Sequence, residues 1–164
     1  MDKRILIIGA SRGIGLGLAQ EFAARGWQVV ATARAEGGPL GETAAASGHR
    51  IDSRLADVTD ESSIAALASN FTEASLDAII LNAGVYGPGD QSISGLTRES
   101  VADILMTNAV GPAQAAAALM PLLRKGATLA LMSSKMGSIA DSSGGSNHYR
   151  MSKVAQNMLA RSLF

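Results

Sequence analysis

The sequence predicts an α/β fold, a doubly wound parallel sheet with helices on both faces, from three observations. Short apolar runs of strand length alternate with stretches that carry apolar residues at helical spacing. Runs such as Ile5–Ile8 and Ala78–Leu81 are apolar at every position, which is typical of strands buried on both faces of a parallel sheet. Glycine, asparagine and serine follow the ends of these runs and separate successive elements.

The first half of the chain holds three of the expected strands. Residues 5–8 are a branched apolar run closed by glycine, and residues 14–25 follow with apolar side chains at helical spacing and a glycine stop. Residues 28–33 predict the second strand, and residues 51–56 carry a weaker strand pattern. Between them, residues 37–48 are rich in glycine, alanine and serine, and hold at most a short helix.

The second half continues the same alternation. Asp60 is a suitable N-cap for a helix that runs to about residue 68. The other expected elements are a strand at residues 78–81, a helical region from Thr97 to about Leu123 with a bend near Gly111-Pro112, a strand at residues 128–132 and a helix at residues 149–163. Since no internal repeat and no linker interrupts them, we expect residues 1–164 to form a single domain.

Composition narrows the classes of partner. Hydrophobic residues make up 47% of the 164 residues, and the 14 basic and 14 acidic side chains cancel. Nucleic acid and anionic membranes are therefore not expected partners, because proteins that bind them carry a basic surplus. The chain has no cysteine, and His49 and His148 lack companions at metal-ligand spacing, so we expect no disulfide and no metal site. Apolar runs are too short for a signal peptide or a membrane span, which favours a cytoplasmic protein.

Residues 9–15, GASRGIG, form a glycine-rich loop between the first strand and the first helix. Glycines allow a tight turn and a close approach of the backbone to a pyrophosphate, and the free N–H groups of a helix N-terminus attract phosphate. We therefore predict a Rossmann-type NAD(P)-binding domain, against the simpler reading of a structural turn. The loop residues expected to bind the cofactor are Gly9, Ser11, Arg12, Gly13, Ile14 and Gly15.

Two arginines favour NADP(H) over NAD(H). NAD-binding proteins usually place an acid at the end of the second strand, to bind the ribose hydroxyls. Here that strand ends in Arg34, whose guanidinium is suited to a 2′-phosphate, and Arg12 supplies a second cation from the glycine loop. Glu36 lies two residues further on and favours the opposite choice, so NAD(H) remains the alternative. Arg34 can also be read as an ordinary solvated arginine.

Tyr149 and Lys153 stand at positions i and i+4 of the last expected helix and therefore share one face. A tyrosine hydroxyl titrates near pH ~10, and a lysine ammonium close to it stabilises the phenolate. Such a pair can serve as a general acid or base. By itself the spacing is common, so its meaning depends on the motifs that precede it.

Taken in order, these motifs resemble the short-chain dehydrogenase/reductase family, and specifically its C-factor-like, carbonyl-reductase branch. They are GASRGIG at 9–15, Asp57-Val58, Asn82-Ala83-Gly84, Asn108, Ser133-Ser134 and YRMSK at 149–153. The resemblance spans essentially the whole chain. It implies an NADPH-dependent enzyme that transfers hydride between nicotinamide and a small carbonyl or alcohol substrate.

The resemblance also implies roles for the catalytic residues. Tyr149 would be the general acid in carbonyl reduction, or the base in alcohol oxidation, and Lys153 would lower its pKa and hold the nicotinamide ribose. Ser134 would hydrogen-bond the substrate oxygen. Asn108 would hold a water that links Lys153 to solvent.

The remaining implied roles concern the cofactor. Asn82, Ala83 and Gly84 would let it lie close over the end of a strand, and Asp57 would contact the adenine with Val58 beside it. The resemblance further implies a homodimer or homotetramer, assembled through the helix from Gly111 to Leu123 and the helix of Tyr149.

The chain departs from the family pattern in three places. Ile8 stands where the family usually has threonine, which removes one supporting hydrogen bond. The distance from Ser134 to Tyr149 is longer than usual, a surface-loop insertion that leaves Ser133 and Ser138 as alternatives to Ser134. The family's strand and substrate-binding loop after the tyrosine helix have no counterpart in these residues.

That third departure leaves several interpretations open. The chain is a fragment, a truncated product, or a chain without its mobile end, and we expect oligomerisation or further residues to cover the apolar edge. The main alternative to an enzyme is an NAD(P)-binding signalling or sensing module with little or no turnover. A third possibility is an inactive fragment that binds nothing.

Overall fold

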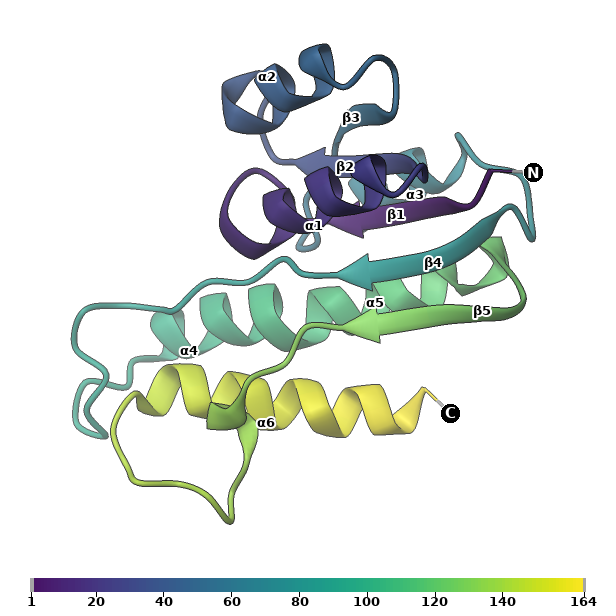
Figure 1. The fold of residues 1–164 in the computed structure, drawn as a ribbon. Helices are drawn as coiled ribbons and strands as arrows, with labels where there is room; N and C mark the ends of the chain where they lie inside the picture. Colours follow the sequence, from purple (N-terminus) through teal and green to yellow (C-terminus); the bar gives the residue numbers. More distant parts are fainter. Residues whose placement is uncertain (1, 164) are drawn as a thin grey trace.

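The computed structural model describes residues 2–163 and contains one parallel sheet, with its strands in the order β3-β2-β1-β4-β5 (Figure 1). The strands are β1 (Arg4–Ile8), β2 (Gln28–Ala33), β3 (Ile51–Leu55), β4 (Leu76–Leu81) and β5 (Leu123–Leu131). This order, with β1 at the centre and the chain crossing from β3 to β4, is that of a Rossmann-type fold. The predicted fold class is confirmed.

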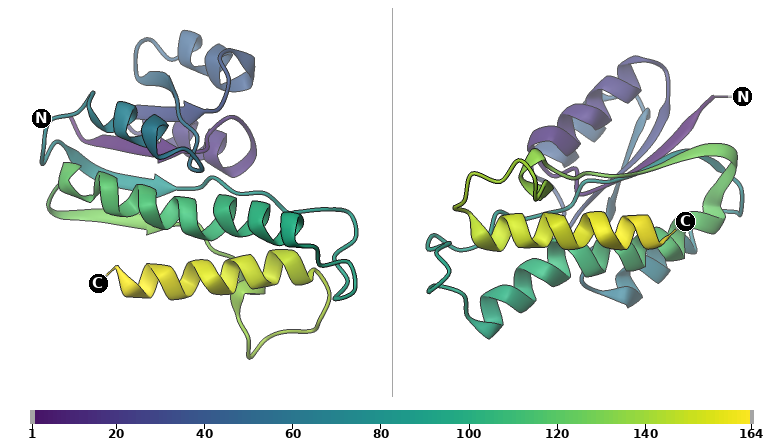
Figure 2. Two further views of the ribbon diagram at one scale, coloured as in Figure 1. Left: turned by 180° about the vertical axis from the view of Figure 1, so that it is seen from behind. Right: turned by 90° about the horizontal axis from the view of Figure 1, so that it is seen from below.

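Helices flank the sheet on both faces (Figures 1 and 2). They are α1 (Gly13–Ala24), α2 (Gly38–Ala46), α3 (Glu61–Ala68), α4 (Arg98–Leu105), α5 (Gly111–Leu119) and α6 (Asn147–Ser162). A π-helical turn, η1 (Met106–Val110), joins α4 to α5, and short 3₁₀ turns occur at η2 (Met120–Leu122) and η3 (Lys135–Gly137). Helix α6 runs beside α4 and α5, against which it packs (Figure 2).

Side chains of β1 alternate between two hydrophobic cores, one on each face of the sheet. Ile5 and Ile7 lie in the core covered by α1 and α2, whereas Leu6 and Ile8 lie in the core covered by α3 and α5. All four are 0–1% exposed. Burial on both faces explains why this strand is apolar at every position.

The structure differs from the expected boundaries mainly around β5. This strand begins at Leu123 rather than at Thr128, and the preceding helix ends at Leu119 rather than near Leu123. The cause is tertiary, because Leu123 pairs with Leu76 of β4, and Arg124 forms an ion pair with Asp77 at 3.0 Å. Since Arg124, Lys125 and Gly126 are not a strand pattern, the sequence alone does not show this extension.

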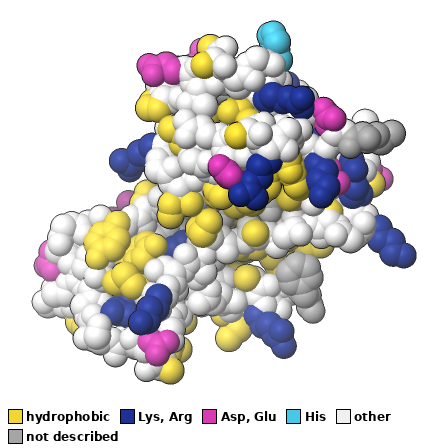
Figure 3. All heavy atoms as spheres, in the orientation of Figure 1, with side chains coloured by type: hydrophobic (Ala, Val, Ile, Leu, Met, Phe, Trp, Pro, Cys, Tyr) yellow, Lys and Arg dark blue, Asp and Glu magenta, His cyan; other side chains and the backbone are white. Residues whose placement is uncertain are grey.

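Other boundaries differ by a few residues. Strand β4 begins at Leu76, two residues before the expected start, and α6 begins at Asn147, two residues before Tyr149. The Asp60 carboxylate accepts a hydrogen bond from Ser62 N at 2.9 Å, so the predicted cap of α3 is confirmed. On the face shown in Figure 3, basic and acidic side chains are interspersed rather than gathered by sign.

Candidate functional site

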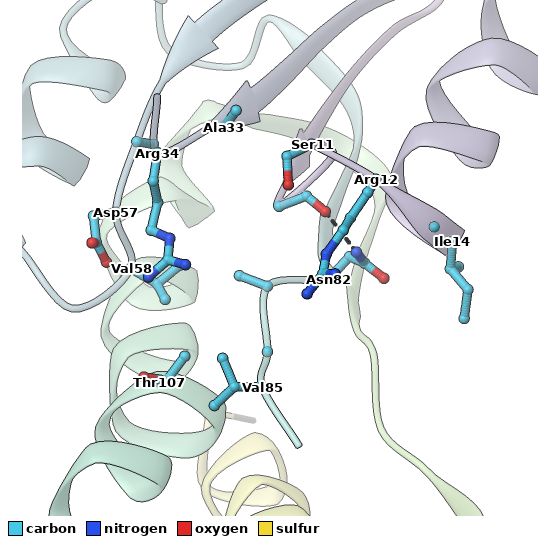
Figure 4. Close-up of a pocket in the computed structure, with 15 residues that line it drawn as sticks. Ser11, Arg12, Ile14, Ala33, Arg34, Asp57, Val58, Asn82, Val85 and Thr107 are labelled. Atoms are coloured by element: carbon cyan, nitrogen blue, oxygen red, sulfur yellow. Dashed lines mark hydrogen bonds between the residues drawn. The ribbon is translucent and has the colours of Figure 1, made fainter. Parts of the chain in front are cut away.

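A cavity of about 320 Å³ opens at the carboxyl edge of the sheet (Figure 4). Eleven of the predicted cofactor residues line it: Gly9, Ser11, Arg12, Gly13, Ile14, Arg34, Asp57, Val58, Asn82, Ala83 and Gly84. They come from four separate segments, which the parallel order of β1, β2, β3 and β4 brings to one edge. Four further lining residues were not predicted, namely Ala33, Ala56, Val85 and Thr107. Their small or apolar side chains give no chemical signal in the sequence.

The glycine loop is packed too closely at Gly9 and Gly15 to admit a side chain at either position. Gly9 has φ +86°, and a Cβ atom on it would lie 2.6 Å from Ala83 Cα. Gly15 is buried behind the loop rather than in the cavity wall, and a Cβ there would lie 2.6 Å from Asn82 Nδ2. Asn82 Nδ2 donates to the Gly9 carbonyl at 2.7 Å, the dashed line in Figure 4. The segment after β4 therefore holds the first turn of the loop in place.

Thr32 is a second support of this loop, and sequence reasoning missed it. It is 0% exposed within β2, and its Oγ1 accepts a hydrogen bond from Gly9 N at 3.1 Å. Its carbonyl accepts a second bond from Ala10 N at 2.7 Å. The sequence signal that could have indicated it is a polar threonine inside an otherwise apolar stretch of the strand. The Gly9 N–H is thus satisfied although Ile8 offers no hydroxyl.

Arg12 and Arg34 extend into the cavity from two sides (Figure 4). Both are exposed, and within residues 2–163 neither guanidinium forms an ion pair. Glu36 is exposed and does not belong to the lining of this cavity. The Asp57 carboxylate lies in the wall, where Oδ1 accepts hydrogen bonds from the N–H and hydroxyl of Thr59 at 2.9 and 2.7 Å.

A second cavity of about 250 Å³ contains the tyrosine and lysine of α6. It shares four lining residues with the first cavity: Ile14, Asn82, Gly84 and Val85. The Tyr149 ring is partly buried and packs on the Tyr86 ring, with 5.0 Å between the centroids. Adjacent cavities that share a wall allow one extended ligand to reach from Arg34 to Tyr149.

Lys153 is held rigidly beside Tyr149. Its side chain is buried, with 4% of the residue exposed, and Nζ lies 5.8 Å from the centroid of the Tyr149 ring. Nζ donates to the Met132 carbonyl at 2.8 Å and to Gln156 Oε1 at 2.9 Å. Burial lowers the pKa of the Lys153 ammonium, because the charged form loses solvation.

Asn108 lies in the π-helical turn η1 and is completely buried. Its Oδ1 accepts from Val85 N at 2.7 Å, and its Nδ2 donates to Val85 O at 2.7 Å and to Ser152 Oγ at 2.9 Å. The side chain therefore ties the segment after β4 to α6. π-Helical turns occur often at functional sites, where they re-aim a side chain.

Three serines that follow β5 differ in position and in how their hydroxyls are used. Ser133 lines the second cavity, whereas Ser134 and Ser138 are not part of its lining. Ser133 donates to Asn157 Oδ1 at 2.6 Å, and Ser138 donates to Asp141 Oδ2 at 2.9 Å. Ser134 instead accepts a hydrogen bond from Met136 N at 3.1 Å. Among the hydrogen bonds of residues 2–163, Ser134 is thus the member of this group whose own proton is not donated.

The N-terminus of α6 is tied to the loop after β4 by contacts that the sequence did not reveal. Gln91 Oε1 accepts from Tyr149 N at 3.2 Å, and the Gln91 carbonyl accepts from Asn147 Nδ2 at 2.7 Å. His148 is 0% exposed, with Nε2 2.8 Å from Ser100 Oγ, so it lies inside the protein rather than in the cavity wall. These contacts hold the first turn of α6 against α4 and the loop after β4.

Two further findings concern metals and membranes. Within residues 2–163 no group of three or more histidine, aspartate or glutamate side chains is arranged to hold a metal ion. No helix in the same range is sufficiently long and apolar to cross a membrane.

Comparison with known proteins gives one family. The family of short chain dehydrogenases matches residues 3–164. The 1-hydroxy-2-glutathionyl-2-methyl-3-butene dehydrogenase of Rhodococcus sp. is 33% identical over 158 residues, which cover 94% of this chain and 67% of that protein. The C-signal protein of Myxococcus xanthus is 39% identical over 105 residues, which cover 60% of each chain.

A solved structure is similar throughout. The carbonyl reductase from Pseudomonas aeruginosa PAO1 in complex with NADP superposes with a TM-score of 0.94 at 38% identity. The superposition covers 99% of this chain and 72% of that one, so the chain spans about three fifths to three quarters of the length of these relatives. The predicted family is confirmed by matches in both sequence and structure, and the chain belongs to the short-chain dehydrogenase family of oxidoreductases.

Proposed function

We propose that this chain is the cofactor-binding and catalytic part of an NADP(H)-dependent oxidoreductase that interconverts a small carbonyl compound and its alcohol. One observation carries the proposal: Tyr149 and Lys153 line a cavity that shares its wall with the glycine-loop cavity. The arrangement supports an acid-base group next to the reactive end of a bound dinucleotide. When bound, the nicotinamide would supply or accept the hydride.

The residues of the first cavity fit a dinucleotide. Gly9 and Gly13 belong to the cavity lining and carry no side chain, so the loop backbone there is open to a pyrophosphate. Gly13, at φ +57° with nothing near its Cβ position, turns the chain into α1. We assign the adenine side to Asp57 and Val58, and the nicotinamide side to Asn82, Ala83 and Gly84.

Cofactor preference rests on Arg12 and Arg34. Both guanidiniums reach the cavity without an ion pair among residues 2–163, so binding a 2′-phosphate would not require breaking one. Glu36 lies outside the lining and so does not oppose that phosphate at the cavity wall. The relative from Pseudomonas aeruginosa was solved with NADP. We therefore propose NADP(H), with NAD(H) as the alternative.

In reduction, Tyr149 would donate its hydroxyl proton to the carbonyl oxygen. Two of the three N–H groups of Lys153 are taken by Met132 O and Gln156 Oε1, which leaves one for the ribose of the nicotinamide. We propose that Asn108, whose side chain joins Val85 to Ser152 of α6, also holds the water that links Lys153 to solvent.

Ser134 is the serine that we assign to the substrate oxygen. A donor to a developing oxyanion needs an uncommitted O–H. Ser133 and Ser138 donate theirs to Asn157 and Asp141, whereas Ser134 accepts from Met136 and keeps its proton. This hydrogen-bond pattern supports the proposal of Ser134 over Ser133 and Ser138.

Replacing Tyr149 with phenylalanine tests the mechanism. The change removes one hydroxyl and keeps the ring that packs on Tyr86. We expect kcat to fall by about 10²–10⁴, the usual contribution of a general acid, while the Kd for NADPH stays within about twofold. Steady-state kinetics on simple aldehydes and ketones, with fluorescence titration of NADPH, checks both. Retained turnover would contradict the assignment of Tyr149.

A second candidate is an NAD(P)-binding signalling or sensing module with little turnover. The similarity to the C-signal protein of Myxococcus xanthus favours it. This candidate predicts NADPH binding without reduction of any carbonyl in a broad panel. Measurable turnover that depends on Tyr149 would eliminate it.

The assembly and location of the protein are also proposals. We propose a homodimer or homotetramer through α5 and α6, which lie side by side in Figures 1 and 2. We propose a cytoplasmic location. Light scattering after size-exclusion chromatography checks the first, and a monomer at all concentrations would contradict it.

A further inference from the structure

Gln156 is a buried polar residue that the mechanism above does not use. It lies on α6 one turn after Lys153 and is 1% exposed. Its Oε1 accepts a hydrogen bond from Lys153 Nζ at 2.9 Å. Its Nε2 has no hydrogen-bond partner among residues 2–163.

The orientation of this amide follows from the lysine. An ammonium group only donates, so the amide oxygen has to face Lys153, and the NH₂ group then points to a place without an acceptor. A buried donor without a partner destabilises the folded state. Leucine or methionine would occupy a similar volume without that cost. A glutamine at this position is therefore explained by its hydrogen bond to Lys153 rather than by packing.

We infer that Gln156 is a positioning residue for Lys153, which it holds beside Tyr149 with the ammonium directed toward the cofactor site. The inference rests on the proposed function. Nζ has two acceptors: the carbonyl of Met132, directly after β5, and Gln156 Oε1, one turn further along α6. Together they determine the direction of the remaining N–H of Nζ. With one acceptor the ammonium could rotate about its single hydrogen bond.

Few charged groups compete for this ammonium. On α6 itself, Tyr149 is the ionisable side chain beside Nζ, and His148, Arg150 and Arg161 lie elsewhere on the helix. Among the elements packed on α6, η1 and α5 carry no ionisable side chain, and the ionisable residues of α4 and η3 are all exposed: Arg98, Glu99, Asp103 and Lys135. Gln156 is thus the side chain that compensates the burial of the lysine charge.

The test compares Gln156→Leu, which removes the acceptor, with Gln156→Glu, which replaces it with a carboxylate. Gln114→Leu is the matched control, because Gln114 is exposed on α5 and its side chain donates a hydrogen bond to Glu61. The readout is the titration midpoint of Lys153, followed by the ¹³Cε resonance of labelled lysine and assigned by its loss in Lys153→Met. This measurement requires neither cofactor nor turnover.

We expect the midpoint of Lys153 to fall by about one pH unit in Gln156→Leu, because the ammonium loses an acceptor, and to rise in Gln156→Glu. The Kd for NADPH should rise about tenfold in Gln156→Leu and stay unchanged in Gln114→Leu. Midpoints that do not move, or a midpoint that moves without any change in Kd, would overturn the inference.

Thermal unfolding shows whether each Gln156 variant is folded. We expect Gln156→Leu to be about as stable as the parent protein, since removal of the unpaired Nε2 offsets the loss of the bond to Lys153. If Gln156→Leu does not fold, Gln156→Met repeats the test with a flexible side chain of similar size. A parent protein that does not bind NADPH would overturn the proposed function, whereas unmoved midpoints would overturn only the role of Gln156.

Discussion

The glycine loop and helix α6 contribute to the two adjoining cavities in different ways. The loop at residues 9–15 provides backbone, and at Gly9 and Gly15 there is no space for a Cβ atom. Helix α6 provides side chains, and Lys153, Ser152 and Gln156 are nearly inaccessible to solvent. The loop is held by Thr32 and Asn82, which bind its backbone, whereas the α6 side chains are held by one another and by Asn108.

A backbone site can be predicted from a sequence more readily than a site made of buried side chains. A backbone site depends on glycine at fixed spacing, which is local information. A site made of buried polar side chains depends on contacts between segments far apart in the chain, such as Asn108 with Val85 and Lys153 with Met132. The two regions should therefore respond differently to substitution.

The largest effect is expected at Gly9. Gly9→Ala forces a Cβ to within 2.6 Å of Ala83 at a φ of +86°, so the loop has to move. We expect a loss of about 3 kcal/mol in the free energy of unfolding and a loss of NADPH binding. Urea unfolding and calorimetry measure both.

Gly17→Ala is the matched control for this substitution. Gly17 is an exposed residue of α1 with nothing within 4 Å of its Cβ position. Alanine there should stabilise the protein by up to about 1 kcal/mol and leave NADPH binding intact. Equal effects at Gly9 and Gly17 would contradict the packing argument.

Asn108→Leu is the corresponding change in the side-chain region. It removes both bonds to the Val85 backbone and the buried bond to Ser152 Oγ, so these groups lose a partner. We expect the free energy of unfolding to fall by about 2 kcal/mol and kcat to fall more than NADPH affinity. Unfolding curves with steady-state kinetics check this, and an unchanged kcat would show that Asn108 serves the fold alone.

A smaller effect is expected at Arg34. Arg34→Ala should raise the Kd for NADPH about 10–100-fold through loss of a charge-assisted hydrogen bond, and leave the Kd for NADH within about twofold. Arg54→Ala is the control, because Arg54 pairs with Asp52 on the edge strand β3. Equal losses for NADPH and NADH at Arg34 would show that it does not distinguish the cofactors.

The smallest effect concerns pH. Burial lowers the pKa of Lys153 from the ordinary 10.5, so the unfolded chain retains the proton to higher pH than the folded one. Between the two pKa values, stability rises with pH, because the folded state sheds a buried charge. Compared with Lys153→Met, the parent protein should gain stability as the pH is raised toward 10.5. Urea unfolding at a series of pH values would contradict this if the difference were constant.

Much of the framework could be predicted from local patterns. The order of strands and helices, the α3 cap at Asp60 and the glycine loop all depend on nearby residues. The start of β5 could not be predicted, because its pairing with Leu76 overrides the polar pattern of residues 124–126. Nor could Thr32 and Gln156 be assigned, because their roles arise only once distant segments meet.

A calorimetric titration of the chain with NADPH and, separately, with NADH is the most direct test of the proposal that the glycine-loop cavity binds NADP(H). We expect one binding site and an affinity for NADPH at least about tenfold higher than that for NADH, since Arg12 and Arg34 face the cavity without ion pairs among residues 2–163. Tighter binding of NADH would reverse the cofactor assignment, and no heat of binding with either dinucleotide would contradict the proposed function of the glycine-loop cavity.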